Sequence, residues 1–257
     1  MHPHKKIPGV DAELLIKDAA ELMPDPLRRQ FLRGAASLGA LALLTGCDVI
    51  DGDTSEAVLN KISKFNDRAQ AALFNRDKLA PTYTEADLTR PFPFNAYYDE
   101  DQAPVVDPVT YKFEIAGLVD SKKPWTLDEL HALPEVSQIT RHVCVEGWSA
   151  IGSWQGAVLS DFLKRIGADT RAKFLYFKCA EGYGNTIDMA TALHPQTQMS
   201  FKYDHTLLPR AYGFPMKIRI PTKLGYKNPK YVVAMEVTNT YRGGYWEDQG
   251  YEFFGGL

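Results

Sequence analysis

Residues 141–148 have the sequence Arg141-His142-Val143-Cys144-Val145-Glu146-Gly147-Trp148 and join a strand-like run to an irregular loop. The run before the cysteine, 136–143, is rich in β-branched side chains, which favour a strand. The residues after it, 146–154, contain two glycines and follow neither a helical nor a strand period. We therefore expect Cys144 at the junction of a strand and a loop, where functional side chains are commonly held.

Chemistry allows two interpretations of Cys144. A lone cysteine is often an inert residue of the core, whereas a thiolate is a soft donor that suits thiophilic metals. The chain has three cysteines, Cys47, Cys144 and Cys179, with no C-x-x-C pair and no spacing typical of a structural zinc site. We interpret Cys144 as a metal ligand; a disulfide with Cys179 is the alternative in an oxidising compartment.

The composition is that of an ordinary globular protein. The 257 residues are 45% hydrophobic, which is enough for a sizeable core. The formal net charge is −3, so the overall charge gives no indication of a nucleic-acid partner. An anionic ligand would therefore need a local cluster of basic side chains.

The N-terminal region resembles an export signal. An uncharged run, 34–46, follows the basic stretch Leu27-Arg28-Arg29-Gln30-Phe31-Leu32-Arg33, and together they resemble a twin-arginine signal. A short buried or amphipathic helix is the alternative. Because the twin-arginine route carries folded proteins, commonly ones already loaded with a cofactor, we expect a cofactor-binding protein in the periplasm. The residues before Cys47 are also similar to a lipoprotein processing site, so membrane anchoring through the signal or a lipidated Cys47 stays open.

Local patterns after the leader indicate an α+β protein. We divide the chain into a leader, 1–47, a helical N-terminal extension, 48–90, and a main domain, 91–257. The spacing of apolar residues predicts a helix from Ser55 to about Phe74. Further patterns predict a proline-rich loop over 90–100, strands over 109–115 and 174–177, a capped helix that begins after Thr126, and a helix over 159–166.

A second informative stretch is Met216-Lys217-Ile218-Arg219-Ile220-Pro221. Alternation places Lys217 and Arg219 on one face of a strand, and Lys223, Lys227 and Lys230 follow closely. Such a basic region is either a solvated surface or a site for an anion. No G-x-x-x-x-G-K-[ST] or G-x-G-x-x-G motif occurs, so a nucleoside triphosphate or a dinucleotide is not indicated.

Taken together, these motifs resemble the sulfite-oxidase superfamily of molybdopterin enzymes, and most closely the catalytic subunit of the periplasmic methionine-sulfoxide reductase system. The matching features occur in one order along the chain. They are the Phe-x-x-Asn-x-x-Tyr-acidic loop, the Cys-Val-Glu-x-Trp-Ser block, Trp154-x-Gly156, Gly213-Phe214-Pro215 with its basic strand, and Pro221-x-Lys223-x-Gly225-Tyr226-Lys227. The resemblance implies a mixed α+β molybdopterin-binding domain of sulfite-oxidase type, without a C-terminal dimerisation domain and monomeric.

The resemblance also implies a set of site residues. Cys144 would ligate a molybdenum atom that a single pyranopterin holds through its dithiolene. The pterin and its phosphate would be bound by Asn95, Tyr98, Asp99, Cys179, Tyr212, Lys217, Asn228, Pro229 and Lys230. Three of these depart from the family pattern, because Lys217 stands for an arginine, Tyr212 for Asn or His, and Cys179 for Thr.

The implied activity is removal of an oxygen atom from a small substrate such as a sulfoxide, with electrons from a separate membrane or periplasmic haem protein. Tyr97, Glu146 and Trp148 would line the substrate pocket. The alternative within the superfamily is a sulfite-oxidising dehydrogenase, in which Arg141 and Arg219 would hold the sulfite dianion.

Two further hypotheses come from other classes of protein. Cys144 could be the nucleophile of a hydrolase, with His142 or His205 as its base. On a strand, Cys144 and His142 would stand about 6–7 Å apart, too far for a direct hydrogen bond. A non-catalytic exported lipoprotein that binds an anion through Lys217 to Lys230 is the third possibility, and it needs no metal.

Overall fold

The structure is a computed structural model that describes residues 62–67, 69–71, 74 and 77–257. The chain divides into two units, 1–60 and 61–257. The predicted leader with its twin-arginine stretch and Cys47, and the start of the predicted helix, lie outside the described residues. That helix is confirmed over 62–67 and 69–71. None of the described helices combines the length and the apolar character needed to cross a membrane.

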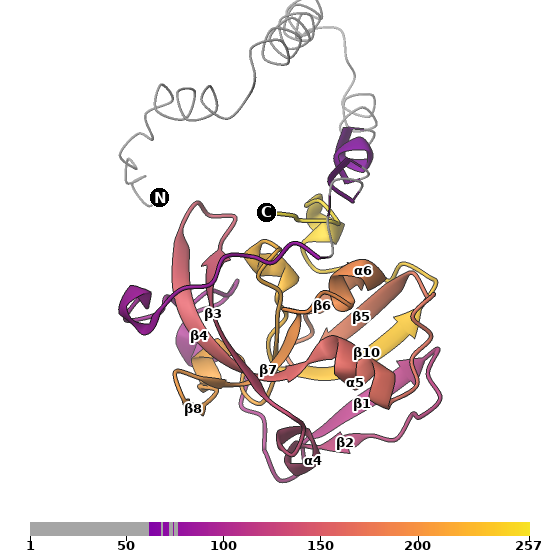
Figure 1. The fold of residues 1–257 in the computed structure, drawn as a ribbon, viewed down its shortest axis with the longest axis horizontal. Helices are drawn as coiled ribbons and strands as arrows, with labels where there is room; N and C mark the ends of the chain where they lie inside the picture. The colour runs from indigo at the N-terminus through magenta and orange to yellow at the C-terminus, as the bar shows by residue number, and fades with distance from the viewer. Residues whose placement is uncertain (1–61, 68, 72–73, 75–76) are drawn as a thin grey trace, which may run out of the picture. The chain divides into compact units, whose positions relative to one another are not determined.

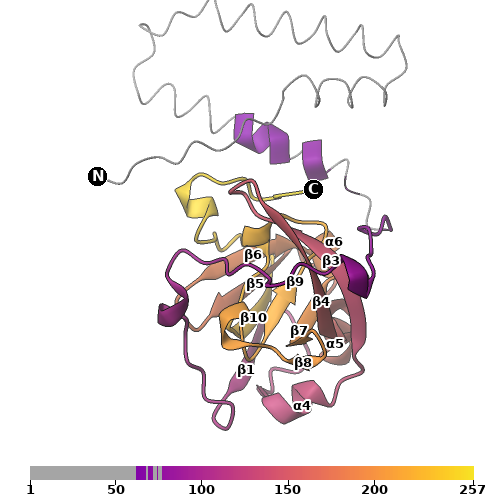
Figure 2. The same cartoon turned by 90° about the vertical axis from the view of Figure 1, so that its left-hand side faces the viewer.

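Two β-sheets and a few short helices form the second unit (Figures 1 and 2). The first sheet has the order β2-β1-β10-β5-β6, and the second has the order β3-β4-β7-β8 with β9 also paired to β7. Strands β1 and β10 are parallel, whereas their other neighbours are antiparallel. These mixed sheets confirm the predicted α+β class.

The strands are β1 (Lys112–Gly117), β2 (Trp125–Thr126), β3 (Val136–Val143), β4 (Ser149–Val158), β5 (Phe174–Cys179), β6 (Gly184–Asp188), β7 (Gln198–Tyr203), β8 (Thr206–Leu207), β9 (Lys217–Arg219) and β10 (Val232–Thr238). The α-helices within residues 77–257 are α4 (Leu127–His131), α5 (Leu159–Arg165) and α6 (Met189–Ala192). The 3-10 turns are η1 (Glu85–Asp87), η2 (Glu100–Gln102), η3 (Arg210–Tyr212), η4 (Gly225–Lys227) and η5 (Glu247–Gln249).

The main core lies between the first sheet and the elements that cover it. Phe113, Phe177 and Met235 from neighbouring strands pack in one buried cluster with Phe162 of α5. A second, aromatic cluster lies on the other sheet around Trp154, which contacts Phe92 and Tyr203 edge-on. The two clusters fix the sheets and so hold the loops at the strand ends in place.

Several local predictions are confirmed. Strand β3 covers the predicted 136–143, and β5 begins at Phe174 and ends at Cys179. The helix predicted after Thr126 forms α4, and its capping box is present, with the Thr126 hydroxyl accepting from the Glu129 N–H. The helix predicted over 159–166 is α5.

The loop predicted for 146–154 is wrong beyond the first few residues, because β4 begins at Ser149. Its residues alternate poorly because both faces of β4 are largely buried. Gly156 is needed for close packing of β7, since a Cβ there would lie 1.9 Å from the Met199 carbonyl oxygen. Within the predicted loop, Gly152 also has close neighbours, since a Cβ there would lie 2.9 Å from Nε1 of Trp154. In the sequence alone, this strand glycine looks like a loop signal.

Two other boundaries need correction. The strand predicted from residue 109 begins at Lys112, because the Asp107 carboxylate accepts from the N–H of Val109 and holds a turn. The prediction that 48–90 is a helical extension does not hold for 77–90. These residues contain one 3-10 turn and no other helix. That segment is extended, and the Ala80 N–H donates to the Gln196 side chain at 2.7 Å.

Candidate functional site

A cavity of about 170 Å³ lies at the tip of the β3–β4 hairpin. Both views of the fold show this tip beside the C-terminal segment (Figures 1 and 2), and Val145 and Tyr251 line the cavity together. Loops from five parts of the chain form its wall. The lining residues are Phe94, Asn95, Ala96, Tyr97, Tyr98, Cys144, Val145, Glu146, Glu181, Tyr183, Gly225, Tyr226, Asn228, Pro229, Lys230, Trp246 and Tyr251.

The hairpin turn presents Cys144 to this cavity. The Cys144 N–H donates to the Trp148 carbonyl at 2.9 Å, and Gly147 closes the turn with a φ of +89°. The thiol is partly buried, and its Sγ lies 3.7 Å from Oε2 of Glu146, which also accepts from the Trp148 indole at 2.9 Å. Burial, together with the Glu146 carboxylate, raises the pKa of Cys144. Cys144 and Cys179 are both free thiols, so the disulfide alternative is wrong.

His142 supports the wall behind Cys144. Its Nε2 lies 3.1 Å from the Asn95 side-chain amide. Burial and the charges of Lys217, Arg219 and Lys230 lower the pKa of His142 well below its usual value, so the ring is neutral and Nε2 accepts from the amide. Its Nδ1 then carries the proton, and this buried atom has no hydrogen-bond partner among the described residues.

Three buried cations lie near this wall, and we call Lys217, Arg219 and Lys230 the unpaired cation group. Lys217 and Arg219 of β9 are fully buried, and both stand over the Trp154 ring, at 4.7 and 6.0 Å from its centroid. The prediction that they share a face is therefore confirmed, and the solvated alternative is wrong.

Neutral oxygens hold two members of the unpaired cation group, Arg219 and Lys230. Arg219 donates to the Asn228 side chain at 2.8 Å and to the Arg141 carbonyl at 2.6 Å, and Lys230 donates to the Asn95 carbonyl at 2.7 Å. Within the part of the chain that the structure describes, no ion pair involves any of the three. Burial is the main cause of the lowered pKa of each, and it brings the pKa of Lys230 to about 8.

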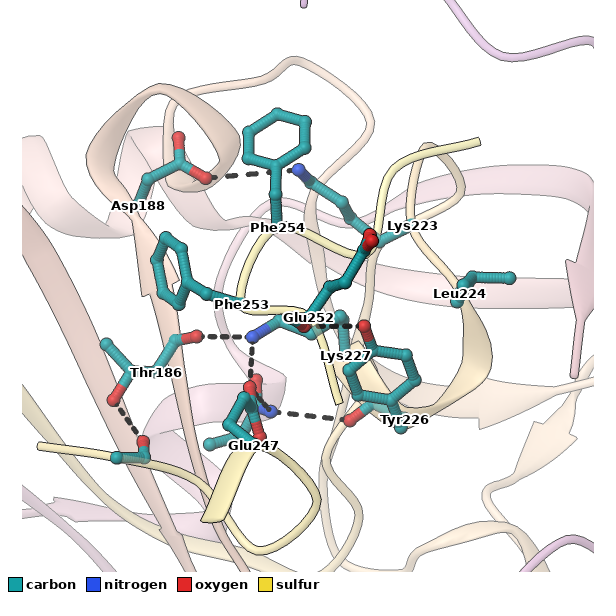
Figure 3. A network of polar contacts seen from close by, with 12 residues as sticks. Thr186, Asp188, Lys223, Leu224, Tyr226, Lys227, Glu247, Glu252, Phe253 and Phe254 are labelled. Carbon is teal, nitrogen blue, oxygen red and sulfur yellow. Dashed lines mark hydrogen bonds and ion pairs between the residues drawn. The ribbon is translucent and has the colours of Figure 1, made fainter. Parts of the chain in front are cut away.

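A different pair of buried lysines, the paired lysine group of Lys223 and Lys227, fastens the C-terminal segment (Figure 3). Lys227 forms a short ion pair with Glu247 and donates to the Thr186 carbonyl at 2.6 Å. Lys223 lies 3.9 Å from the Asp188 carboxylate and over the ring of Phe254. These contacts anchor the segment that carries the cavity residues Trp246 and Tyr251.

The structure brings most, but not all, of the predicted site residues to the cavity. Asn95, Tyr98, Cys144, Asn228, Pro229 and Lys230 line it, as do Tyr97 and Glu146 from the predicted substrate pocket. The remaining predicted residues, Asp99, Tyr212, Cys179, Lys217 and Trp148, do not line it. Asp99 is exposed before η2, and Tyr212 belongs to the aromatic cluster and donates to the Phe92 carbonyl. Cys179 is buried at the end of β5, and Lys217 is buried on β9.

Sequence reasoning missed several lining residues, notably Glu181, Tyr183, Trp246 and Tyr251. The last two come from the C-terminal segment, whose path depends on the buried Lys227–Glu247 contact. Glu181 and Tyr183 belong to the turn between β5 and β6, and a turn after a strand ending at the predicted Cys179 is the one signal that could have indicated them.

The geometry does not support the hydrolase hypothesis. Nε2 of His142 is hydrogen-bonded to the Asn95 side chain. His205 is an exposed residue that contacts Gln155 and Glu85. The arginines suggested for sulfite also lie outside the cavity lining, since Arg141 is exposed and Arg219 is bound to Asn228.

Comparisons with known proteins identify the family of the chain. Residues 100–246 match the family model described as oxidoreductase molybdopterin binding domain. The chain is 54% identical, over the full length of both proteins, to the "Putative protein-methionine-sulfoxide reductase subunit YedZ1" of Azospira oryzae. It is 25% identical to the protein-methionine-sulfoxide reductase catalytic subunit MsrP of Ralstonia nicotianae, over 60% of this chain and 55% of that protein.

A solved structure shows the same fold. The sulfane dehydrogenase SoxCD of Paracoccus pantotrophus superposes with a TM-score of 0.51 at 19% identity, covering 54% of this chain and 40% of that one. The family predicted from the cysteine block and the basic strand is thus confirmed. The chain belongs to the oxidoreductase molybdopterin-binding domain family and is a molybdopterin-binding oxidoreductase.

Proposed function

We propose that this protein is exported to the periplasm and reduces a sulfoxide by removing its oxygen atom, with Cys144 as the protein ligand to molybdenum. One observation carries the proposal. Cys144 lies on the wall of a cavity that Lys230 of the unpaired cation group also lines. A soft sulfur donor and an excess of buried positive charge are what a metal with an anionic organic carrier requires.

The residues present fit a molybdenum–pterin cofactor. Buried cations are normally paired with carboxylates, but the unpaired cation group has no such partner in the described part of the chain, and a phosphate would supply the missing charge. Two buried donors nearby, Nδ1 of His142 and Nε of Arg219, lack hydrogen-bond partners among the described residues. Lys230, which lines the cavity, would therefore hold the phosphate, and the nearby buried charges of Lys217 and Arg219 would add attraction. Asn95 and Tyr98 would contact the pterin.

When bound, the cofactor supplies the two-electron chemistry. The chain's own residues prepare the site for it. The turn at Gly147 fixes the direction of the Cys144 sulfur, which must lose its proton to bind metal. The aromatic wall of Tyr97, Trp246 and Tyr251 orients an apolar substrate and limits access of water. Glu146, held by Trp148, lies next to the sulfur on the open side.

The electrons would come from a separate haem protein. The Azospira relative is named as a subunit of a reductase, and a subunit implies a partner protein. This supports a partner for the present chain as well. Export is supported by the resemblance of residues 27–46 to a twin-arginine signal. Replacing Arg28 and Arg29 with lysine should abolish recovery of the protein from the periplasm, and unchanged recovery would contradict the proposed route.

Molybdenum X-ray absorption tests the ligand directly. The Cys144→Ser variant should show one sulfur neighbour fewer around molybdenum than the wild type, while Cys179→Ser should show the wild-type number. Equal sulfur counts in the wild type and Cys144→Ser would exclude Cys144 as the ligand. Turnover measured with dimethyl sulfoxide and with sulfite then decides the direction, and we expect measurable rates with the sulfoxide.

A further inference from the structure

Two carboxylic side chains line the cavity, and their surroundings differ. Glu146 is exposed, and its Oε2 accepts from the Trp148 indole at 2.9 Å. Glu181 is largely shielded, and its buried Oε2 has no hydrogen-bond partner in the described part of the chain. Burial without a hydrogen-bond partner raises the free energy of a charged carboxylate, so it favours the protonated carboxyl.

The turn between β5 and β6 holds Glu181 in this position. The Cys179 N–H donates to the Tyr183 carbonyl at 2.9 Å, and Gly182 closes the turn with a φ of +85°. The titratable and charged groups whose charges couple to that of Glu181 are Lys230, Cys179, Tyr97, Tyr98, Tyr183 and Tyr231.

Lys230 is the single cation in that set, and it opposes the effect of burial. Burial dominates and raises the pKa of Glu181 to about 7. Near neutral pH this carboxyl therefore exchanges a proton readily, which is the property required of a general acid.

Sulfoxide reduction needs such a group. The sulfur–oxygen bond breaks, two electrons enter, and the oxygen takes up two protons to leave as water, so that R₂SO, two electrons and two protons give R₂S and H₂O. The electrons would come from the reduced cofactor, which two one-electron transfers from the haem partner would restore. The protons must be delivered within a cavity walled largely by aromatic side chains.

We propose that Glu181 is the catalytic acid that delivers a proton to the oxygen leaving the sulfoxide. The inference rests on the proposed function, because it assigns a role within that reaction. It is carried by the position of Glu181 on the wall that also presents Cys144, by its unpartnered oxygen, and by the engagement of Glu146 with Trp148.

A single-turnover experiment tests the proposal on the holoprotein. Dithionite-reduced enzyme is mixed with dimethyl sulfoxide, and reoxidation is followed by absorbance from pH 5 to 9. The wild-type rate should be constant below about pH 7 and fall above it. Glu181→Gln should lose a factor of about 10² at pH 6 and lose the break in the profile, and Glu181→Asp should restore the break.

Two controls separate a proton donor from a structural residue. Glu135→Gln removes a partly buried carboxyl that is paired with Lys202 outside the cavity, and it should leave the rate and profile unchanged. Infrared spectroscopy of cofactor-free protein gives a second signal that is independent of turnover. A protonated carboxyl band should disappear near pH 7 in the wild type and be absent from Glu181→Gln.

The outcomes are distinct. A Glu181→Gln variant with full molybdenum content, the wild-type rate and the same pH break would overturn the assignment, and so would loss of molybdenum alone, which would make Glu181 a cofactor-binding residue. Wild-type protein that holds molybdenum but does not reduce sulfoxides would refute the proposed function instead. In that case the infrared band would still show whether Glu181 holds a proton at neutral pH.

Discussion

The paired lysine group and the unpaired cation group lie within 14 residues of one another in sequence, from 217 to 230, yet their surroundings differ. Lys227 meets Glu247, and Lys223 lies near Asp188. Lys217 and Arg219 are buried at least as deeply, but no ion pair in the described part of the chain includes them. A buried cation with a carboxylate fastens the chain, whereas one without a carboxylate leaves positive charge for a ligand.

The two groups therefore serve one cavity in different ways. The paired lysine group holds the C-terminal segment through Glu247 and Phe254 (Figure 3). This segment supplies the cavity residues Trp246 and Tyr251. The unpaired cation group supplies positive charge at the cavity wall, where its member Lys230 is a lining residue. The same substitution, lysine to methionine, should consequently have opposite effects on stability at Lys227 and at Lys217.

The largest effect is expected for Lys227→Met. The change leaves the Glu247 carboxylate buried without its cation, which costs about 3–5 kcal/mol of unfolding free energy. Denaturant unfolding of the cofactor-free protein measures this loss. The double variant Lys227→Met/Glu247→Gln removes both charges and should recover much of the stability; no recovery would show that packing, and not charge, fixes the segment.

A smaller effect of opposite sign is expected for Lys217→Met in the cofactor-free protein. Lys217 is fully buried, and its charge is disfavoured by burial and by Lys230 and Arg219. Removing this disfavoured charge should raise the unfolding free energy by about 1–3 kcal/mol, the usual cost of burying a polar group without compensation. A marked loss of stability would mean that Lys217 has a structural partner and does not belong to the unpaired cation group.

Lys223→Met should change stability least, by about 1 kcal/mol at pH 7, because Asp188 and the face of Phe254 partly offset the cost of burying the ammonium. Burial lowers the pKa of Lys223 from 10.5 to about 7. Between these pH values the unfolded state binds the additional proton, so the unfolding free energy of the wild type rises with pH.

Comparison of unfolding curves at pH 7 and pH 9 tests this pH dependence. The stability of wild type relative to Lys223→Met should increase at the higher pH. A difference that stays constant or moves in the other direction would show that the Lys223 ammonium keeps its proton throughout this range.

The sequence is sufficient for features that depend on local patterns. Strand β3, the capped helix α4 and the position of Cys144 follow from residues close together in the chain. Strand β4 could not be predicted, because it is buried on both faces and has a glycine where the neighbouring strand β7 approaches. Trp246 and Tyr251 reach the cavity through the distant Lys227–Glu247 contact, which leaves no local signal.

The same limit applies to the cations. Alternation along 216–221 predicts that Lys217 and Arg219 share a face, but the choice between solvent and burial depends on Trp154, which arrives from β4. Likewise, the carboxylates that separate the two groups come from 188 and 247 and cannot be assigned from spacing. Charge alone indicates an anion site, and the partners decide which cations form it.

The most direct test of the account is the ratio of molybdopterin to protein in exported Lys217→Met, compared with Lys223→Met prepared in the same way. We expect Lys217→Met to retain clearly less cofactor than the wild type, because losing a nearby buried positive charge worth about 1.4 kcal/mol weakens binding about tenfold. Lys223→Met should retain the wild-type amount. Full retention by Lys217→Met would contradict the claim that cations without carboxylate partners bind the cofactor.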